Sequence, residues 1–296
     1  MHTLGIILAG GKSTRLFPAT NVTTKQLLPV YDKPLIYYPL STLMLLRIRD
    51  FVIITNKEEQ PLFKKLLSDE LGINIAFAIQ PEPNGIAESF KIARDYVDVS
   101  KFDKTTLILG DNIFYGSHMS MMFGELLADD AKDYGTIILK TVKGNEAYRF
   151  GVVSGYGSDG RIIEVVEKPK NYTEKTARMV TGLYFFPSDV YDKVYRVKPS
   201  ARGELEITDL INLYLVEDRM DHMVLPRGMI LYDTGTPDSL ADATNFIRGL
   251  QDQGTMVGSP HEIAYRNGWI TKEQLEVSCL KYEKSEYGSY LKELLW

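Results

Sequence analysis

The chain has 296 residues, of which 44% are hydrophobic and 25% charged, and its formal net charge is −5 at pH 7. This composition is typical of a globular protein with one large core or two modest ones, and its negative charge argues against nucleic acid and membrane surfaces as partners. One cysteine excludes an internal disulfide, and without an apolar run near ~20 residues or a basic leader segment we expect a cytoplasmic enzyme.

Short apolar runs in the first half of the chain predict buried strands, and the stretches between them predict helices. The strands are expected at residues 4–9, 50–55, 73–79, 105–110 and 135–140, and the helices at 36–47, 58–69, 86–97 and 118–130. Strands that are apolar on both faces and alternate with helices predict a parallel sheet covered on both sides. Such sheets bind ligands at the carboxyl ends of their strands.

The first predicted strand leads into the glycine-rich turn of GIILAGGKSTRL, which spans Gly5 to Leu16. Its glycines miss the pattern G-x-x-x-x-G-K-[ST] by one residue, and no third glycine completes G-x-G-x-x-G. Backbone N–H groups in a turn after a buried strand still bind anions, and Thr14 and Arg15 add side-chain donors. We therefore expect a phosphate site of a third kind.

Three charged residues accompany this turn. Lys25 follows ten residues later; such a lysine is usually solvated, but beside a phosphate turn it becomes a plausible charge clamp. Asp111 closes the fourth strand, where it suits either Mg²⁺ beside phosphate oxygens or a simple Asx-turn. Asp233 lies in the turn of YDTGTPDSL and could share a metal with Asp111, but the sequence alone does not show that the two meet.

The second half of the chain has a mixed pattern. Strands are expected at 150–155, 161–168, 180–186 and 221–226, and helices at 187–196, 206–217 and 237–250. The last ~45 residues are expected to be helical, either packed on their own domain or making a subunit contact. Glu167, Lys168 and Arg202 stand out as charged residues next to turns, although each alone is more often a surface charge than a ligand.

Taken together, these segments resemble the glucose-1-phosphate thymidylyltransferase family, which makes dTDP-glucose for deoxysugar synthesis. The matching motifs, in order, are GIILAGG-x-x-TRL, KQLLPVYDKPLIYYPLSTLML, GDNIFYG, EKP, VTGLYF, RGELEITD and DTGT-x-DSL. The resemblance implies an α/β fold with a Rossmann-like, mostly parallel central sheet, helices on both faces and an inserted sugar-binding part. It implies a catalytic domain at 1–250, with a nucleotide part mainly at 1–140 and a sugar part mainly at 141–235. The helical region 251–296 is then expected to serve subunit contact or regulation.

The resemblance also assigns roles to individual residues. Positions that match the nucleotide site are Leu8, Gly10, Gly11, Ser13, Thr14, Arg15, Lys25, Gln26, Gln80, Gly85 and Asp111. Positions that match the sugar site are Asn112, Phe150, Gly151, Glu167, Lys168, Val180, Arg202, Ile86 and Leu231. Among these, Gln80 and Gly85 are expected to read the base, because an amide can pair with a donor and an acceptor on thymine.

The implied reaction is nucleotidyl transfer, in which the phosphate of glucose 1-phosphate attacks the α-phosphorus of dTTP and pyrophosphate leaves. The attacking group is already an anion, so no general base is needed. Bringing two polyanions together is the difficulty, and we expect a ring of positive charge to solve it. The catalytic groups implied are Arg15, Lys25, Lys168, Asp111 and Asp233, with the two aspartates as Mg²⁺ ligands.

Four positions depart from the family pattern. Ser13 replaces a glycine, and if that position needs a positive φ the serine costs ~1 kcal/mol, whereas otherwise its hydroxyl adds a phosphate donor. Phe150 replaces a common tyrosine, Ile86 a leucine, and Leu231 a tryptophan. By the resemblance, the last three lie near the sugar pocket and leave the reaction class intact but not the identity of the sugar. Our hypothesis is that a pocket without the indole at 231 admits bulkier or modified sugars.

Regulation and alternatives complete the expectations. The family is commonly a homotetramer inhibited by its end product at a second nucleotide site. The residues that resemble that site are Tyr115, Gly116, His118, Glu262, Ile263 and Arg266. One alternative is the same chemistry with UTP, since a single methyl discriminates by only ~10–200-fold. Another is a non-catalytic nucleotide-sugar sensor, which predicts loss of phosphate or metal ligands that are in fact present.

Overall fold

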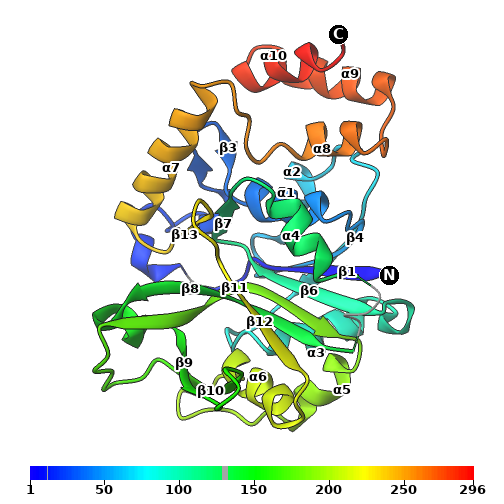
Figure 1. Ribbon diagram of the computed structural model, residues 1–296. Helices are drawn as coiled ribbons and strands as arrows, with labels where there is room; N and C mark the ends of the chain where they lie inside the picture. The colour runs from blue at the N-terminus through cyan, green and yellow to red at the C-terminus, as the bar shows by residue number, and fades with distance from the viewer. Residues whose placement is uncertain (12, 129–132) are drawn as a thin grey trace.

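A nine-stranded sheet forms the centre of the protein (Figure 1). The computed structural model describes residues 1–11, 13–128 and 133–296. Four strands of the first half run parallel in the order β5, β4, β1, β6, with bounds Asn74–Ile79, Asp50–Thr55, Thr3–Leu8 and Lys104–Leu109. These are the strands predicted at 73–79, 50–55, 4–9 and 105–110. The apolar residues of β1, β4 and β6 are nearly all buried on both faces as expected, whereas most of those in the edge strand β5 are only partly buried.

The other half of the sheet is mixed, which corrects the expectation of a mostly parallel sheet within the confirmed α/β fold. Strand β11 (Thr176–Pro187) runs antiparallel to β6 and to β8 (Gly135–Lys143), and β12 (Met220–Val224) runs parallel to β8. Strands β9 (Gly151–Tyr156) and β10 (Ile162–Glu167) form an antiparallel hairpin beside β11. Parallel neighbours need a crossover of a dozen or more residues, and the connection between these two strands is too short for one.

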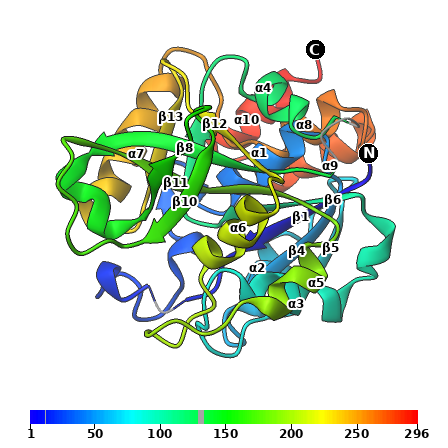
Figure 2. The same cartoon turned by 60° about the horizontal axis from the view of Figure 1, so that its bottom comes forward.

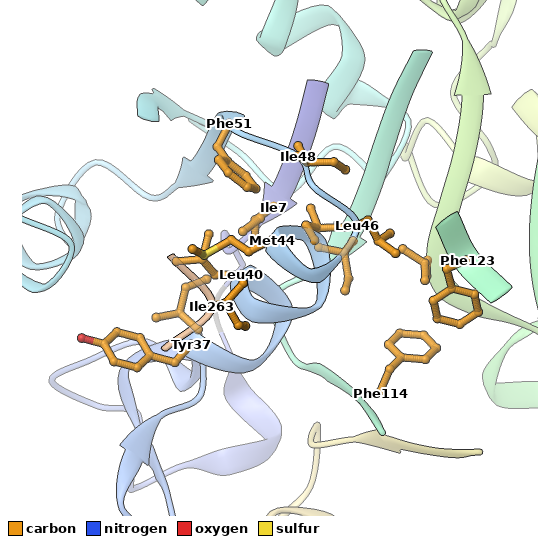
Figure 3. Close-up of a cluster of buried hydrophobic side chains, with 14 of the residues drawn as sticks. Ile7, Tyr37, Leu40, Met44, Leu46, Ile48, Phe51, Phe114, Phe123 and Ile263 are labelled. Carbon is orange, nitrogen blue, oxygen red and sulfur yellow. The ribbon is translucent and has the colours of Figure 1, made fainter. Parts of the chain in front are cut away.

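Helices cover both faces of the sheet. One face carries α1 (Tyr37–Leu45), α2 (Gln60–Leu66) and α4 (Met119–Glu125), whose apolar residues pack with Ile7 and Phe51 in one core (Figure 3). The other face carries α3 (Glu88–Tyr96), α5 (Val190–Lys193) and α6 (Ile207–Val216), packed around Ile6 and Val52. Adjacent residues Ile6 and Ile7 thus enter different cores, as the alternation of a strand requires.

Shorter elements complete the part of the chain before the C-terminal helices. Helix α7 (Pro237–Gln251) begins at a Thr236 capping box and packs against β2 (Pro29–Val30), which pairs with β3 (Lys33–Pro34). A separate ribbon joins β7 (Asn112–Tyr115) to β13 (Ile230–Asp233). Neither β7 nor β13 was predicted as a strand, and their pairing decides where Asp233 lies. The predicted helix 118–130 ends in residues outside the described part of the chain.

The C-terminal helices lie at the end of the molecule opposite the β9–β10 hairpin in Figure 1, and Figure 2 brings that hairpin and α6 forward. They are α8 (Pro260–Arg266), α9 (Lys272–Lys281) and α10 (Glu286–Glu293). Ile263, Leu275 and Leu291 belong to the same core as α1, so these helices pack on their own chain, and the predicted subunit contact stays a prediction.

A polar network holds these C-terminal helices in place. Asp69, after α2, accepts hydrogen bonds from the buried His261 at 3.0 Å and from Tyr282 at 2.8 Å, and also pairs with Lys281. Tyr287 joins the other ring nitrogen of His261 at 2.9 Å. Burial would raise the pKa of Asp69, but the hydrogen bonds from His261, Lys281 and Tyr282 outweigh burial and hold that pKa well below its usual value.

Among the helices that the structure describes, none has the length and apolar character of a membrane-spanning segment.

Candidate active site

The glycine-rich turn follows β1 and is held by the ends of two neighbouring strands. Gly11 has φ 103°, a conformation that favours glycine. Its N–H donates to Oδ1 of Asn56 at 3.2 Å, and Nδ2 of Asn56 donates to its carbonyl at 3.3 Å. Asn56 follows β4 and was not predicted, although its place after a buried strand matches that of Asn112. The side chain thus braces the turn that is expected to bind phosphate.

Ser13 adopts the left-handed conformation, with φ 47° and ψ 31°. This position therefore has the positive φ at which a serine, unlike the usual glycine, is strained. The backbone strain costs ~1 kcal/mol. Its Oγ is buried and has no hydrogen-bond partner among the described residues. Thr14 and Arg15, next in the chain, are exposed, as groups that meet a ligand need to be.

Lys25 and Asp111 form an ion pair at the carboxyl end of β6. Lys25 is the first residue of a 3-10 turn (Lys25–Leu27), in which Gln26 is buried. Gln26 packs closely on Gly110, because a Cβ placed on that glycine would lie 3.0 Å from Cγ of Gln26. Burial would raise the pKa of Asp111, but the charge and hydrogen bond of Lys25, with a 3.1 Å hydrogen bond from Asn112, hold it below its usual value. Asp111 is therefore ionised beside a cation.

The β7–β13 ribbon brings Asp233 to Asp111. Asp233 pairs in register with Asn112, and the N–H and Oγ1 of Thr234 donate to the Asp111 carbonyl at 3.1 and 2.9 Å. The pKa of Asp233 is raised, mainly by burial and next by the negative charge of Asp111. The nearby cations lower this pKa but do not outweigh those effects; they are Lys25, Arg15 and Arg149. Two carboxylates far apart in the sequence thus share one polar site.

Arg15 reaches this pair from the glycine-rich turn. A Cβ placed on Gly235 would lie 2.6 Å from Nη2 of Arg15 and 3.0 Å from Oδ1 of Asp233, so a larger residue here would require the guanidinium to move. Lys140 donates to the Leu231 carbonyl at 2.9 Å, on the strand that ends in Asp233. Arg149 and Lys140 add positive charge that the sequence patterns did not reveal.

A second charged group collects at the end of β10. Nη2 of Arg202 lies 3.4 Å from Oε1 of Glu167, and Nζ of Lys168 lies 3.3 Å from the same oxygen. Arg202 is also held by the buried Glu206 at 2.9 Å. Oγ1 of Thr208 donates to Oε2 of Glu167 at 3.3 Å. The structure thus brings the three predicted residues together, and Glu206 and Thr208, both in RGELEITD, orient them.

The remaining predicted sugar positions lie around these groups. Asn112 accepts a hydrogen bond from the Gly182 N–H at 3.2 Å, next to Val180 on β11. A Cβ on Gly151 would lie 2.6 Å from Thr208 Cγ2. Phe150 is half-buried under the Arg149 guanidinium, 5.0 Å from its ring centre.

Leu231 and Ile86, two of the positions that depart from the family pattern, lie in apolar surroundings. Leu231 is buried in the core, in register with Phe114 of β7, and Ile86 is a partly buried neighbour of the core around α3. The change from tryptophan to leucine at 231 is thus a change within a packed region.

The predicted base-reading residues lie at the carboxyl end of β5. Gln80 is buried beside Gly10. Gly85 has φ 106°, and a Cβ there would lie 2.3 Å from the Leu205 carbonyl, so this position requires glycine. Backbone hydrogen bonds to Leu205 hold the loop on both sides of Gly85. The Leu205 N–H donates to the Asn84 carbonyl at 2.6 Å, and the Leu205 carbonyl accepts from the Ala87 N–H at 3.1 Å.

A separate cavity of about 360 Å³ lies between α1, the end of β7 and α8. All six residues predicted for a second nucleotide site line it, namely Tyr115, Gly116, His118, Glu262, Ile263 and Arg266. Nε of Arg266 donates to Oε1 of Glu262 at 2.7 Å. Strand β7 therefore begins beside Asp111 and ends at this cavity.

Comparison with known proteins agrees with this geometry. Residues 4–249 match the family model described as nucleotidyl transferase. The chain is 44% identical to a glucose-1-phosphate thymidylyltransferase of Neisseria meningitidis over 98% of this chain and 99% of the relative. It is 46% identical to one of Xanthomonas campestris over 97% and 95%. A Bacillus anthracis protein solved with sucrose superposes with a TM-score of 0.71 at 35% identity, over 83% of this chain and 95% of its own. The chain thus belongs to the nucleotidyl transferase family, among the glucose-1-phosphate thymidylyltransferases.

Proposed function

We propose that the protein transfers a thymidylyl group from dTTP to α-D-glucose 1-phosphate, giving dTDP-glucose and pyrophosphate. This is the first step of dTDP-deoxysugar synthesis, of the kind that leads to dTDP-rhamnose. The observation that carries the proposal is the meeting of Asp111 and Asp233 beside Arg15 and Lys25, at the turn after β1. Identity of about 45% over nearly the full length of the relatives supports the same substrates.

The charges fit a reaction between two polyanions. Arg15 and Lys25 approach the site from the nucleotide side, and Lys168 and Arg202 from the sugar side. Fixed cations offset the repulsion between the two phosphates and stabilise the charge that spreads over the α-phosphate in the transition state. The attacking phosphate oxygen is already ionised, so the chain needs to supply orientation and charge rather than a base.

The two aspartates fit Mg²⁺. The described residues contain no group of three or more His, Cys, Asp or Glu side chains that could enclose a metal, which speaks against a site made by protein ligands alone. Mg²⁺ is usually held by one or two carboxylates together with substrate phosphates, and Asp111 and Asp233 supply that pair. Bound there, the ion would neutralise negative charge on the phosphates of dTTP. Lys25 forms an ion pair with the Asp111 carboxylate.

We further propose a homotetramer in the cytoplasm with end-product inhibition at the cavity between β7 and α8. Glu262 and Arg266 offer an acceptor and a cation there, which suit a ribose and a phosphate. Light scattering of the purified protein would report the oligomeric state.

A pyrophosphate-release assay tests the reaction. With Mg²⁺, the arms are dTTP or UTP combined with glucose 1-phosphate or galactose 1-phosphate. Fast release with dTTP and glucose 1-phosphate, abolished in Asp111→Asn, is the expected result. Comparable turnover across several sugars would mean that Phe150, Ile86 and Leu231 have widened the pocket. No release in any arm would overturn the proposal in favour of a nucleotide-sugar sensor.

A further inference from the structure

The side-chain amide of Gln80 is held by two acceptors. Its Nε2 donates to Oε2 of Glu88 at 2.8 Å and to the Gly85 carbonyl at 3.4 Å. A carboxylate and a carbonyl accept hydrogen bonds and do not donate them. The amide atom that faces them must therefore be the nitrogen, whichever way the side chain is drawn.

This arrangement turns the amide oxygen in the opposite direction. A Cβ placed on Gly10 would lie 3.1 Å from Oε1 of Gln80, so the oxygen lies against the glycine-rich turn. The backbone N–H of Gln80 is fixed by the Thr55 carbonyl at 2.9 Å, and the residue is buried. The oxygen thus has a defined position and faces the side on which the nucleotide is proposed to bind.

Glu88 is itself well placed to hold the amide. It is the first residue of α3, where the helix dipole favours a negative charge. Its other oxygen accepts from Nδ2 of Asn84 at 3.0 Å. Gly85 is equally constrained, since its contact with Leu205 requires glycine. Both acceptors are therefore held in place, Glu88 by its position in α3 and by Asn84, and Gly85 by its close contact with Leu205.

We infer that Glu88 is a positioning residue that sets base specificity by keeping Oε1 of Gln80 toward the base. An oxygen there accepts the N3–H of thymine or uracil. Cytosine, with the same ring size, presents a bare N3 whose lone pair repels that oxygen. The inference rests on the proposed role of Gln80 in reading the base, and it explains how an amide that could face either way selects one class of pyrimidine.

The ratio of kcat/KM for dTTP to that for dCTP, measured by pyrophosphate release with glucose 1-phosphate and Mg²⁺, tests this role. Glu88→Met keeps the side-chain length and removes the acceptor, so we expect the ratio to fall about tenfold, the value of one hydrogen bond. Glu88→Gln retains an acceptor oxygen and should keep the ratio. Glu286→Met, at the same first position of α10, is the matched control for losing a first-turn carboxylate.

The outcomes separate this inference from the proposed function. A purely structural role of Glu88 would lower both kcat/KM values together and leave the ratio unchanged, which would overturn the inference if Gln80→Ala still lowers it. An unchanged ratio in Gln80→Ala would instead overturn the assignment of Gln80 to the base, and the inference with it. A ratio that falls equally in Glu88→Gln and Glu88→Met would show that charge, not an acceptor, is responsible, and would also contradict it.

Discussion

Asp111 and Asp233 share one site, yet their pKa values shift in opposite directions. Burial raises both, but Asp111 has Lys25 and Asn112 as direct partners, and these outweigh the burial. Asp233 receives only more distant positive charge and also feels the charge of Asp111. An ionised Asp233 therefore lowers the stability of the folded chain, and such perturbed groups are common in functional sites.

This asymmetry predicts that Asp233→Asn stabilises the ligand-free protein. The pKa of Asp233 is higher in the folded than in the unfolded chain, so wild-type stability falls as pH rises from about 3.8 through the folded value. The variant lacks this loss and should unfold at higher urea concentration at pH 7, with the gain vanishing near pH 3.8. Activity should fall by about a hundredfold or more. Equal or lower stability of the variant at pH 7 would contradict the assigned pKa direction.

Gly235 provides a second test at this scale. In Gly235→Ala the new Cβ would lie 2.6 Å from Nη2 of Arg15, so the guanidinium must move. We expect kcat/KM to fall by roughly a hundredfold, because small misplacements of a catalytic group are costly. Gly249→Ala is the control: that site is in α7, and no described atom beyond its own helix lies within 4 Å of the new Cβ. It should raise Tm slightly. Unchanged activity in Gly235→Ala would show that Arg15 does not act at Asp233.

Much of the site could be predicted at the level of residues, but not the groups that orient it. Arg15, Lys25, Asp111 and Asp233 belong to motifs that follow strands or turns, and that pattern is visible in the sequence. Asn56, Arg149, Glu206 and Glu88 carry no such pattern, because their roles come from partners that only the folded chain supplies.

The short ribbon of β7 and β13 shows the same limit at the level of elements. Long apolar strands such as β1 and β4 can be predicted from the sequence, because their run of apolar residues is long enough to recognise. Strands β7 and β13 have four residues each, and their sequences are typical of loops. Their pairing joins segments more than a hundred residues apart, and nothing local encodes it. The direction of β11 was likewise set by its partners rather than by its composition.

The contact between the C-terminal helices and the rest of the chain can be tested through Asp69. Its pKa is depressed in the folded state, so its contribution to stability is present above about 3.8 and is lost as the pH falls. Asp69→Asn should lower the free energy of unfolding at pH 7 by about 2 kcal/mol, since the hydrogen bonds from His261, Lys281 and Tyr282 are weakened. In urea titrations the difference from wild type should shrink below pH 4. A difference that does not depend on pH would mean that the carboxylate charge plays no part.

For the whole molecule, the important feature is that β7, which lies outside the nine-stranded sheet, connects two sites. The carboxyl ends of β1, β4, β5 and β6 lie at one edge, where we propose that the nucleotide binds and where parallel strands usually bind ligands. Strand β7 extends from that edge to the cavity lined by α8. The cavity residues were predicted from the resemblance, but their convergence depends on how residues 251–296 fold back onto α1.

A variant of the cavity should separate regulation from catalysis. Arg266 lies in the cavity and not among the residues around Asp111, so Arg266→Ala should keep kcat within about twofold. It should weaken inhibition by a dTDP-linked sugar about tenfold or more, because a charge-assisted hydrogen bond is lost. The test is the concentration of inhibitor that halves activity in wild type and variant. An unchanged value would place end-product binding elsewhere.

The hydrogen bonds of Leu205 have a consequence for the order of events in turnover. They join the loop that carries Gly85 to the segment that carries Arg202 and Glu206. If Arg202 binds the sugar phosphate and the Gly85 loop binds the base as proposed, we expect each ligand to restrain the segment that binds the other. Such linkage is reciprocal by thermodynamic necessity. The expected result is that the affinity for each substrate rises when the other is bound, by the same factor for both.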